Sequence, residues 1–565
     1  RSLFAWLHSK MFLQTVLALT TILLNHVTSS SDTTRPHIVF IIADDLGWND
    51  VGFHGSNQIP TPNIDALAYS GIALHNYYVS AICTPSRSAL MTGKYPIHTG
   101  MQHTVLFGAE PRGLPLTERL LPEYLRDLGY VNRLVGKWHL GSYKKEYTPT
   151  YRGFDSHLGY WTGHQDYFDH TACETGFWGL DMRKGMEVAW DLHGKYSTDI
   201  FTEESVKVIR THNTSRPLFL YLGHTAVHSG NPYNPLPAPD KDVAAFFDIE
   251  DFNRRKFAAM LSKLDDSVGE VMKALQDTGM INNCIVIFTT DNGGPAAGFN
   301  LNAASNWPLR GVKNTLWEGG VRGVGLIWSP LLPNGWVSTD LMHISDWLPT
   351  LLSAANGNTS VLSNIDGVDQ WPSLSQGVAT RRMQVLHNID DIYGNSALTV
   401  GDWKIVKGTT YNGQWDSWYG PSGRPDNHTR PYDVARVINS LAGNAAASVG
   451  HTILHDKVLK MRLKMDIQCT GEARKSPCSP LEHPCLFNVK ADPCEQNNLA
   501  DRYPAVLRHL ESLIRDINTT AVPPGNLPID KHGDPRLWDH TWTNFGDYSD
   551  SNKITVQEFP MVISN

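Results

Sequence analysis

The order of short apolar runs along the chain restricts its fold more than any other feature of the sequence. The runs at residues 37–42, 218–222 and 284–288 are almost entirely apolar, and each leads into a polar or glycine-rich segment. Runs that are apolar on both faces are typical of strands buried between helices. Helical patterns lie at residues 198–212 and 257–277, between these runs. The alternation predicts an α/β fold with a central, mainly parallel sheet.

The sequence changes character after about residue 380. Residues 397–406 have the pattern of a hairpin, and residues 499–518 have that of one helix. A chain of 565 residues exceeds the size at which a single hydrophobic core stops growing. We predict a large N-terminal domain at residues 35–385 and a smaller domain with an antiparallel sheet at residues 386–565.

Composition and charge exclude several classes of protein. Apolar residues make up 41% of the chain and charged residues 18%, which is close to the globular average and excludes a wholly disordered chain or a coiled coil. The net charge is −8 and no long basic run occurs, so nucleic acid is not an expected partner.

The first 30 residues have the features of a secretory leader. Met11 is the predicted start, and the mostly apolar residues 12–24 follow it. This stretch of 13 residues is shorter than the roughly 20 that span a bilayer, and small residues at 28–31 offer a cleavage site. We predict a signal peptide within residues 1–30 and no stable membrane span. The alternative for the leader is a membrane anchor.

Sequons for N-glycosylation support entry into the secretory pathway. They lie at Asn213, Asn358, Asn427 and Asn518. Together with a signal peptide they predict a glycosylated protein that is lysosomal or secreted.

Acidic residues follow two of the apolar runs. Asp44-Asp45 and Asp291-Asn292 each come directly after a predicted buried strand. Functional groups gather beyond the carboxyl ends of parallel strands. These side chains supply only hard oxygen ligands, which suit calcium or magnesium and not zinc. Asp44-Asp45 alone would fit a helix N-cap or a turn, but two such pairs, each after a buried strand, favour a metal site.

The most informative motif surrounds Cys83. A bare Cys-x-Pro-x-Arg fits a buried or disulfide-bonded cysteine, but here Cys83-Thr84-Pro85-Ser86-Arg87 is followed by Thr92-Gly93-Lys94-Tyr95 and by Gly100. This longer string resembles the sulfatase signature. The resemblance implies that a formylglycine-generating enzyme oxidises Cys83 to formylglycine in the endoplasmic reticulum. The hydrated aldehyde then has one hydroxyl to attack sulfur and a second to release sulfate.

Further motifs resemble the remaining active-site segments of the sulfatase family. Gly136-Lys137-Trp138-His139 resembles the second signature, with Asn132 where Ser or Thr is usual. The resemblance implies the following roles. One calcium ion binds Asp44, Asp45, Asp291, Asn292 and the group derived from Cys83, and the polar catalytic set is Arg87, Lys137, His139, His228 and Lys313. His224 and His170 are rivals for the role of His228.

Several strings narrow the resemblance to the arylsulfatase B group and its I and J relatives. They lie at residues 306–311, 316–323, 343–350 and 485–488. The implied fold is an alkaline-phosphatase-like α/β sandwich with a small C-terminal antiparallel sheet, in which residues 35–385 form the catalytic domain. The implied activity is that of an arylsulfatase-type sulfuric ester hydrolase.

The implied substrates are sulfated N-acetylgalactosamine glycans or aryl sulfates. An aromatic face such as that of Trp161 or Trp415 would stack on a sugar. One alternative is a small-molecule sulfate such as a glucosinolate, and another is an inactive binding homologue. A phosphatase or phosphodiesterase on the same scaffold is disfavoured, because such enzymes typically use Ser or Thr with two zinc ions.

The chain has seven cysteines, an odd number. If Cys83 becomes formylglycine, six remain. We predict that the four closely spaced cysteines pair among themselves; these are Cys469, Cys478, Cys485 and Cys494. Cys284 is predicted to be a free, buried thiol at the start of a strand. Cys173 is predicted to lie in a loop without an evident partner.

Overall fold

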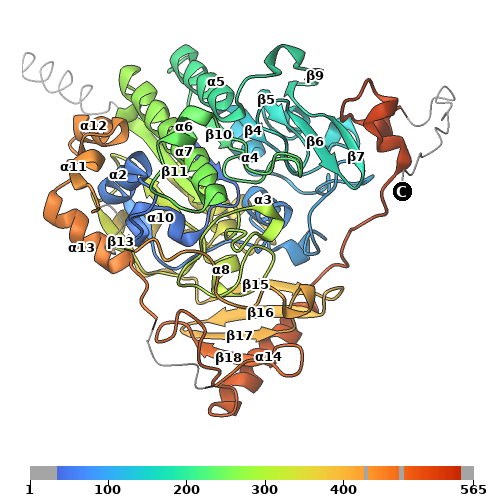
Figure 1. Ribbon diagram of the computed structural model, residues 1–565, viewed down its shortest axis with the longest axis vertical. Helices are drawn as coiled ribbons and strands as arrows, with labels where there is room; N and C mark the ends of the chain where they lie inside the picture. Colours follow the sequence, from blue (N-terminus) through green and yellow to red (C-terminus); the bar gives the residue numbers. More distant parts are fainter. Residues whose placement is uncertain (1–34, 425–430, 470–475, 549–565) are drawn as a thin grey trace, which may run out of the picture. The chain divides into compact units, whose positions relative to one another are not determined.

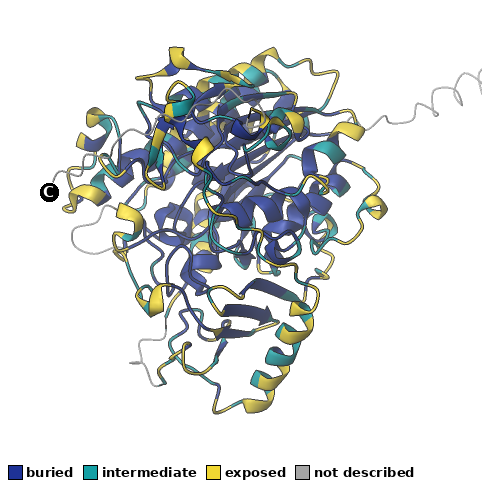
Figure 2. Ribbon diagram, turned by 90° about the vertical axis from the view of Figure 1, so that its right-hand side faces the viewer, coloured by how far each residue is buried: buried dark blue, intermediate teal, exposed yellow. Residues whose placement is uncertain are grey.

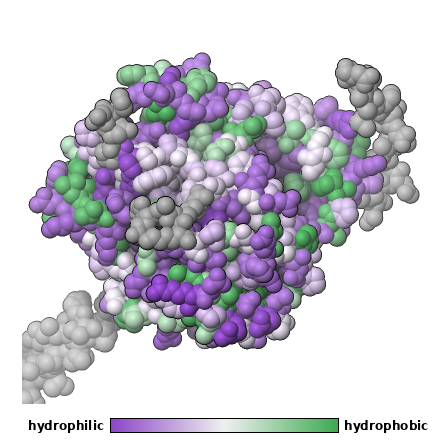
Figure 3. Space-filling view, turned by 60° about the horizontal axis from the view of Figure 1, so that its bottom comes forward, coloured by the Kyte–Doolittle hydropathy of each residue, from purple (hydrophilic) through white to green (hydrophobic). Residues whose placement is uncertain are grey.

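The computed structural model describes residues 35–424, 431–469 and 476–548, and Pro36–Asn565 group as one compact unit. The predicted leader with Met11 and the sequon at Asn427 lie outside the described residues. Within the described residues, no helix is long and apolar enough to cross a membrane. On the face shown in Figure 3, hydrophobic side chains lie in separate groups among hydrophilic ones. The predicted domain boundary near residue 385 stays a prediction.

A ten-stranded sheet forms the centre of the fold, in the order β13-β2-β12-β11-β1-β10-β4-β5-β8-β9 (Figure 1). The five strands from β11 to β5 run parallel to their neighbours. The predicted mainly parallel sheet is therefore confirmed. The strands are β1 (His37–Ala43), β2 (Ile72–Leu74), β4 (Val131–Lys137), β5 (Ser156–Tyr160), β8 (Arg183–Lys184), β9 (Glu187–Val188), β10 (Leu218–Gly223), β11 (Cys284–Thr290), β12 (Gly325–Trp328) and β13 (Trp336–Ser338).

Helices cover both faces of this sheet, because its central strands are apolar on both sides. Alternate residues of β1 enter different cores: Val39 and Ile41 pack with α5 and α7, whereas Ile38 and Phe40 pack with α3, α4 and α9. Figure 2 shows the strands as buried ribbon between helices with exposed outer faces. The helices are α2 (Pro62–Ser70), α3 (Cys83–Thr92), α4 (Leu121–Asp127), α5 (Ser197–Thr211), α6 (Asp240–Ala244), α7 (Phe252–Asp277), α8 (Glu318–Val321), α9 (Trp347–Ala354), α10 (Trp371–Gln376), α11 (Val434–Ile438), α12 (Leu441–Ser448), α13 (His455–Met465) and α14 (Pro504–Asn518).

The predicted helices at 198–212 and 257–277 correspond to α5 and α7. Helix α7 begins earlier than its apolar stripe, since the side chain of Asp251 accepts a hydrogen bond from the amide of Arg254 and caps the helix. The later helices α11 to α13 return to the main core, where they pack with α2 and α7.

A second, antiparallel sheet is built from β15 (Gln384–Asp390), β16 (Asn395–Val400), β17 (Trp403–Lys407) and β18 (Cys485–Asn488). β16 and β17 form the predicted hairpin, with Val400 opposite Trp403. Helix α14 packs on this sheet and starts at Pro504, later than predicted, because proline suits the first turn of a helix. Two short two-stranded sheets complete the fold: β3 (Tyr77–Tyr78) with β14 (Met342–His343), and β6 (Thr171–Glu174) with β7 (Phe177–Leu180).

The cysteines follow the predicted division. Disulfides join Cys469 to Cys494 and Cys478 to Cys485, so the four C-terminal cysteines pair among themselves. Cys83, Cys173 and Cys284 are free thiols. Cys284 opens β11, as predicted. Cys173 lies in β6 and not in a loop, because residues 171–174 pair with β7.

A buried ionic network joins the small sheet to the segment that carries Lys313. The Nζ atom of Lys404 in β17 lies 2.8 Å from Glu318 Oε1 and 2.9 Å from Glu495 Oε1, and these side chains are fully buried. The amide of Glu318 donates to Glu495 Oε2 at 2.7 Å. Buried charges destabilise a protein unless each is paired with an opposite charge.

We predict that Lys404→Met destabilises the protein by about 3–5 kcal/mol, because it leaves two buried carboxylates without their shared cation. Urea unfolding monitored by circular dichroism measures the change. The matched control is Lys407→Met at the exposed end of the same strand, which should change stability by about 0.5 kcal/mol or less. Equal losses in the two variants would contradict the role given to the network.

Candidate active site

The strand order brings the predicted site residues to one edge of the sheet. β11, β1, β10 and β4 are neighbours and parallel, so their carboxyl ends meet. Asp291 follows β11, Asp44 follows β1, His228 lies beyond the end of β10, and Lys137 ends β4. Residues far apart in the sequence thus become neighbours, as do Asp45 and Asn292, which are 247 positions apart.

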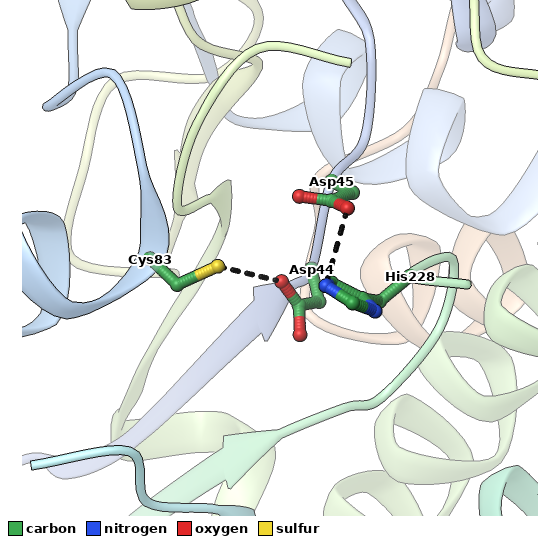
Figure 4. A group of neighbouring side chains, drawn as sticks. All are labelled: Asp44, Asp45, Cys83 and His228. Carbon is green, nitrogen blue, oxygen red and sulfur yellow. Dashed lines mark hydrogen bonds and ion pairs between the residues drawn. The ribbon is translucent and has the colours of Figure 1, made fainter. Parts of the chain in front are cut away.

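Cys83 enters this site from the other side as the first residue of α3. Its Sγ lies 3.6 Å from Asp44 Oδ1, and its side chain is 1% exposed. Figure 4 shows the side chains of Asp44, Asp45, Cys83 and His228 converging, with Cys83 directed at Asp44. Burial raises the pKa of the thiol to about 12, so an unmodified Cys83 is a thiol and a poor nucleophile at neutral pH. The helix N-terminus beside it favours an anionic ligand.

Each aspartate of the site has a buried cation as its partner. Lys137 Nζ lies 2.6 Å from Asp44 Oδ2, and Lys313 Nζ lies 2.7 Å from Asp45 Oδ1. The Nε and Nη2 atoms of Arg87 donate to Asp291 Oδ2 at 3.0 and 2.9 Å. All six side chains are at most 4% exposed. Three positive and three negative charges therefore balance in a place that excludes water.

The oxygen atoms at the centre of the site suit a cation. Asp44, Asp45, Cys83 and His228 each offer one ligand atom, and these atoms lie within 4.8 Å of one another. Asn292 donates through Nδ2 to Asp45 Oδ1 at 2.7 Å, whereas its buried Oδ1 has no hydrogen-bond partner among the described residues. A buried carbonyl oxygen without a partner is costly, and a hard cation would satisfy it. The carboxylate oxygens of Asp44 and Asp45 and the amide oxygen of Asn292 therefore fit calcium, whereas a thiol sulfur and an imidazole nitrogen are softer ligands.

Two predicted proton carriers differ in charge. Burial and the nearby charge of Lys313 lower the pKa of His228 to about 3, so its imidazole is neutral. Burial opposes protonation of Lys313, but the adjacent Asp45 outweighs it and raises the pKa of the ammonium above its ordinary value. Lys313 therefore carries the proton at physiological pH.

His139 is held in an unusual backbone conformation. Its φ is 57°, in the left-handed region, as is that of Asp45 at 63°. The Nε2 atom of His139 lies 2.9 Å from the carbonyl oxygen of Leu106, so the ring donates there when Nε2 carries the proton. Its buried Nδ1 has no hydrogen-bond partner in the described part of the chain. Burial and the charges of Lys137 and Arg87 lower the pKa of His139 well below its usual value.

The two histidines that rival His228 form hydrogen bonds with residues outside the metal cluster. His224 lies 3.0 Å from Ser267 Oγ, and His170 lies 2.9 Å from the carbonyl oxygen of Lys195. Asn132 donates to backbone carbonyl groups at 2.6 and 2.8 Å, which gives it a structural role. Trp161 is 1% exposed and lies against Arg183, so it has no free face for a sugar.

Sequence analysis missed His164, which forms part of the wall of the site. Its ring stacks on His228 with centroids 5.8 Å apart, and its Nδ1 lies 3.8 Å from Glu174 Oε1. Glu174 is fixed by backbone amides of Gly108 and Gly163 at 2.7 and 2.8 Å. Residues 161–170 contain no motif that a single sequence would reveal.

Comparison with known proteins agrees with this geometry. The family model described as Sulfatase matches residues 36–357. Arylsulfatase J of Mus musculus is 39% identical over 546 residues, which cover 93% of this chain and 82% of that protein. N-acetylgalactosamine-6-sulfatase of Rattus norvegicus is 31% identical over 411 residues, which cover 68% of this chain and 73% of that protein.

Solved structures share the fold. The crystal structure of Ps i-CgsB has a TM-score of 0.67 and 25% identity, and the match covers 89% of this chain and 97% of that one. PsFucS1 sulfatase from Pseudoalteromonas sp. has a TM-score of 0.62 and 23% identity, covering 89% and 94%. The predicted α/β sandwich with a small antiparallel sheet is confirmed. The chain belongs to the sulfatase family and is a sulfuric ester hydrolase.

Proposed function

We propose that this protein hydrolyses sulfate esters of N-acetylgalactosamine glycans or of aryl alcohols, using one calcium ion and a formylglycine formed from Cys83. The observation that carries the proposal is the position of Cys83, at a buried helix N-terminus beside Asp44 and among three carboxylate–cation pairs. Because burial raises the pKa of its thiol to about 12, an unmodified Cys83 would be protonated and a poor nucleophile. Hydrated formylglycine supplies an oxygen nucleophile at this position.

Asp44, Asp45, Asp291 and Asn292, with the modified residue 83, would hold the calcium ion. When bound, calcium polarises the sulfuryl oxygens as a Lewis acid. The charge balance explains why the ion is needed. Asp44, Asp45 and Asp291 cancel Arg87, Lys137 and Lys313, so only the added divalent charge makes the site attractive to an anionic ester. The fixed cations then face the charge that moves during S–O cleavage.

Proton delivery to the departing alcohol is assigned to Lys313. Lys313 is protonated at neutral pH, and calcium bound by Asp45 would weaken the attraction of that carboxylate for the ammonium and so lower its pKa towards the range of a useful acid. The neutral His228 offers a hydrogen bond only. His139 would hold the diol, since its Nδ1 is free of partners among the described residues. The intact polar set disfavours the alternative of an inactive binding homologue, and Cys83 with Asn292 disfavours a two-zinc phosphatase.

The proposed cellular setting is the secretory pathway, lysosomal or secreted, with a formylglycine-generating enzyme as a partner during biosynthesis. The sequons at Asn213, Asn358 and Asn518 are exposed, which suits glycosylation. Among substrates, the similarity to N-acetylgalactosamine-6-sulfatase favours sulfated N-acetylgalactosamine over a small-molecule sulfate such as a glucosinolate.

The first prediction of the proposed function concerns Cys83 itself. In protein from a host that contains the modifying enzyme, the peptide with residue 83 should be about 18 Da lighter than the thiol form, as measured by mass spectrometry, because an aldehyde replaces the thiol. The peptide with Cys284 serves as the internal control and should keep its thiol. An intact thiol at position 83 in protein that turns over sulfate esters would contradict the proposal.

The second prediction concerns the metal. Calcium at roughly 100 times its Kd should stabilise the protein by about 2–3 kcal/mol, seen as a rise in Tm. Asp291→Asn should abolish both this rise and turnover, and chelation should inactivate the unaltered protein until calcium is restored. Asp346→Asn is the matched control, because Asp346 is also buried against an arginine, Arg382. A calcium response that persists in Asp291→Asn would remove Asp291 from the metal site.

The third prediction concerns the leaving group. Lys313→Met should lower kcat for sugar sulfates by about 10²–10⁴-fold, and by much less for 4-nitrophenyl sulfate, whose phenolate leaves without a proton. Because the pKa of Lys313 is raised, loss of its proton should not reduce activity between about pH 5 and 8. His228→Gln is the control and should affect both substrates equally. The assignment fails if the leaving-group dependence follows His228 instead.

A further inference from the structure

We propose that the segment after β17, together with Phe299, supplies a second sugar-binding subsite beside the active site, with Tyr411 as its main contact, so that the substrate is an oligosaccharide sulfate. This proposal rests on the proposed function, to which it adds the class of alcohol. The aromatic platform comprises Phe299, Tyr411 and Trp415.

The three rings of the platform pack edge to face and leave one of them open. The centroid of Phe299 lies 5.6 Å from that of Tyr411 and 5.0 Å from that of Trp415. Tyr411 is 44% exposed although it is large and mostly apolar. Such packing holds the ring in place while its free face is available, which is the arrangement that binds the C–H face of a sugar.

Hydrogen bonds of Asn314 connect the platform to the active site. This residue follows Lys313 directly, and its amide donates to the carbonyl oxygen of Ala81 at 2.6 Å, two residues before Cys83. Its Nδ2 donates to the hydroxyl of Tyr411 at 3.0 Å, and Thr410 Oγ1 donates to its carbonyl oxygen at 2.7 Å. Tyr411 is therefore one hydrogen bond away from the residue next to Lys313.

A second contact joins the platform to the segment that carries His228. Phe299 precedes Asn300, whose carbonyl oxygen accepts a hydrogen bond from Ser229 Oγ at 2.8 Å. Ser229 follows His228, so the platform contacts both of the segments whose side chains, His228 and Lys313, lie against Asp45. A sugar next to the sulfated one would lie against the platform.

Polar groups accompany the rings, as a sugar subsite requires. Tyr393, in the connection between β15 and β16, carries a further hydroxyl group. The ring of His103 lies 4.6 Å from that of Tyr393, and its Nδ1 lies 2.8 Å from Asp390 Oδ2. Hydroxyl, amide and imidazole groups of this kind can exchange hydrogen bonds with sugar hydroxyls.

The backbone at the platform is held in a conformation that most residues avoid. Tyr411 and Asn412 both have a φ of 52°, and Asn314 has a φ of 63°. Left-handed conformations of this kind are uncommon in residues other than glycine, and they cluster where a side chain must be aimed for function. The conformation here aims the Tyr411 hydroxyl at Asn314 while its ring stays exposed.

The experiment compares a sulfated N-acetylgalactosamine monosaccharide with an oligosaccharide that ends in the same sugar, each sulfated at position 4 or 6. Binding is measured by calorimetry with calcium present, in a Cys83→Ala background that prevents turnover. The oligosaccharide should bind about tenfold more tightly than the monosaccharide, and Tyr411→Ala should remove this advantage. Tyr411→Phe keeps the ring and should retain most of it. Trp190→Ala, which removes an exposed aromatic side chain on η6 (Trp190–Leu192), is the matched control and should change nothing.

Hydrolysis is measured in parallel, with residue 83 unaltered. Tyr411→Ala should raise KM for the oligosaccharide about tenfold, leave kcat nearly unchanged, and leave 4-nitrophenyl sulfate unaffected. Equal binding of the monosaccharide and oligosaccharide, or equal effects of Tyr411→Ala on both, would overturn the subsite. Binding that depends on Tyr411 without any hydrolysis would support the subsite and overturn the proposed function, so the two failures are distinguishable.

Discussion

The site depends on the neutralisation of three aspartates that are buried at the ends of two adjacent strands. Removing a carboxylate from water costs several kcal/mol even after relaxation, and the cost is offset only when a cation with good geometry lies beside it. Asp44, Asp45 and Asp291 meet this condition through Lys137, Lys313 and Arg87. The cations come from β4, from the segment after β11 and from α3, so neutrality requires that these elements are all in place together.

This neutrality gives the proposed calcium ion a double role. Without the ion, the three cations and the three aspartates neutralise one another, so the site has no net charge to attract a sulfate ester. The ion supplies that net positive charge. It also provides the buried Oδ1 of Asn292 with the partner that it lacks among the described residues. Anion binding and metal binding are therefore linked by charge, although the arginine and lysines, not the aspartates, would contact the anion.

The sequence predicts the scaffold well, because the scaffold rests on local patterns. Strands such as β1 and β11 are apolar on both faces, and the polar residues that follow them mark the functional edge. The pairings of Asp44 with Lys137 and of Asp45 with Lys313 could not be derived this way, since they depend on strand order. His164 and Tyr411 escape sequence analysis for a different reason: each lies in an irregular segment whose path is set by tertiary contacts, and one exposed tyrosine looks like any other. Cys173 was misplaced because β6 and β7 are short and carry little alternation.

The site residues that the sequence predicts and those that it misses differ in function, for a reason that follows from the chemistry of sulfate esters. Every such ester presents the same sulfuryl group, so the aspartates, the cations and residue 83 can select the reaction but cannot distinguish one alcohol from another. Selectivity must come from side chains that reach beyond the sulfuryl group. In the proposed subsite those would be the groups around Asn314, which the segment after β17 contacts, and His164 beside His228 would form another part of the wall. The buried Lys404 network joins the small sheet to Glu318, in the segment preceding Arg322. Through this contact the small sheet is linked to the segment that carries Lys313.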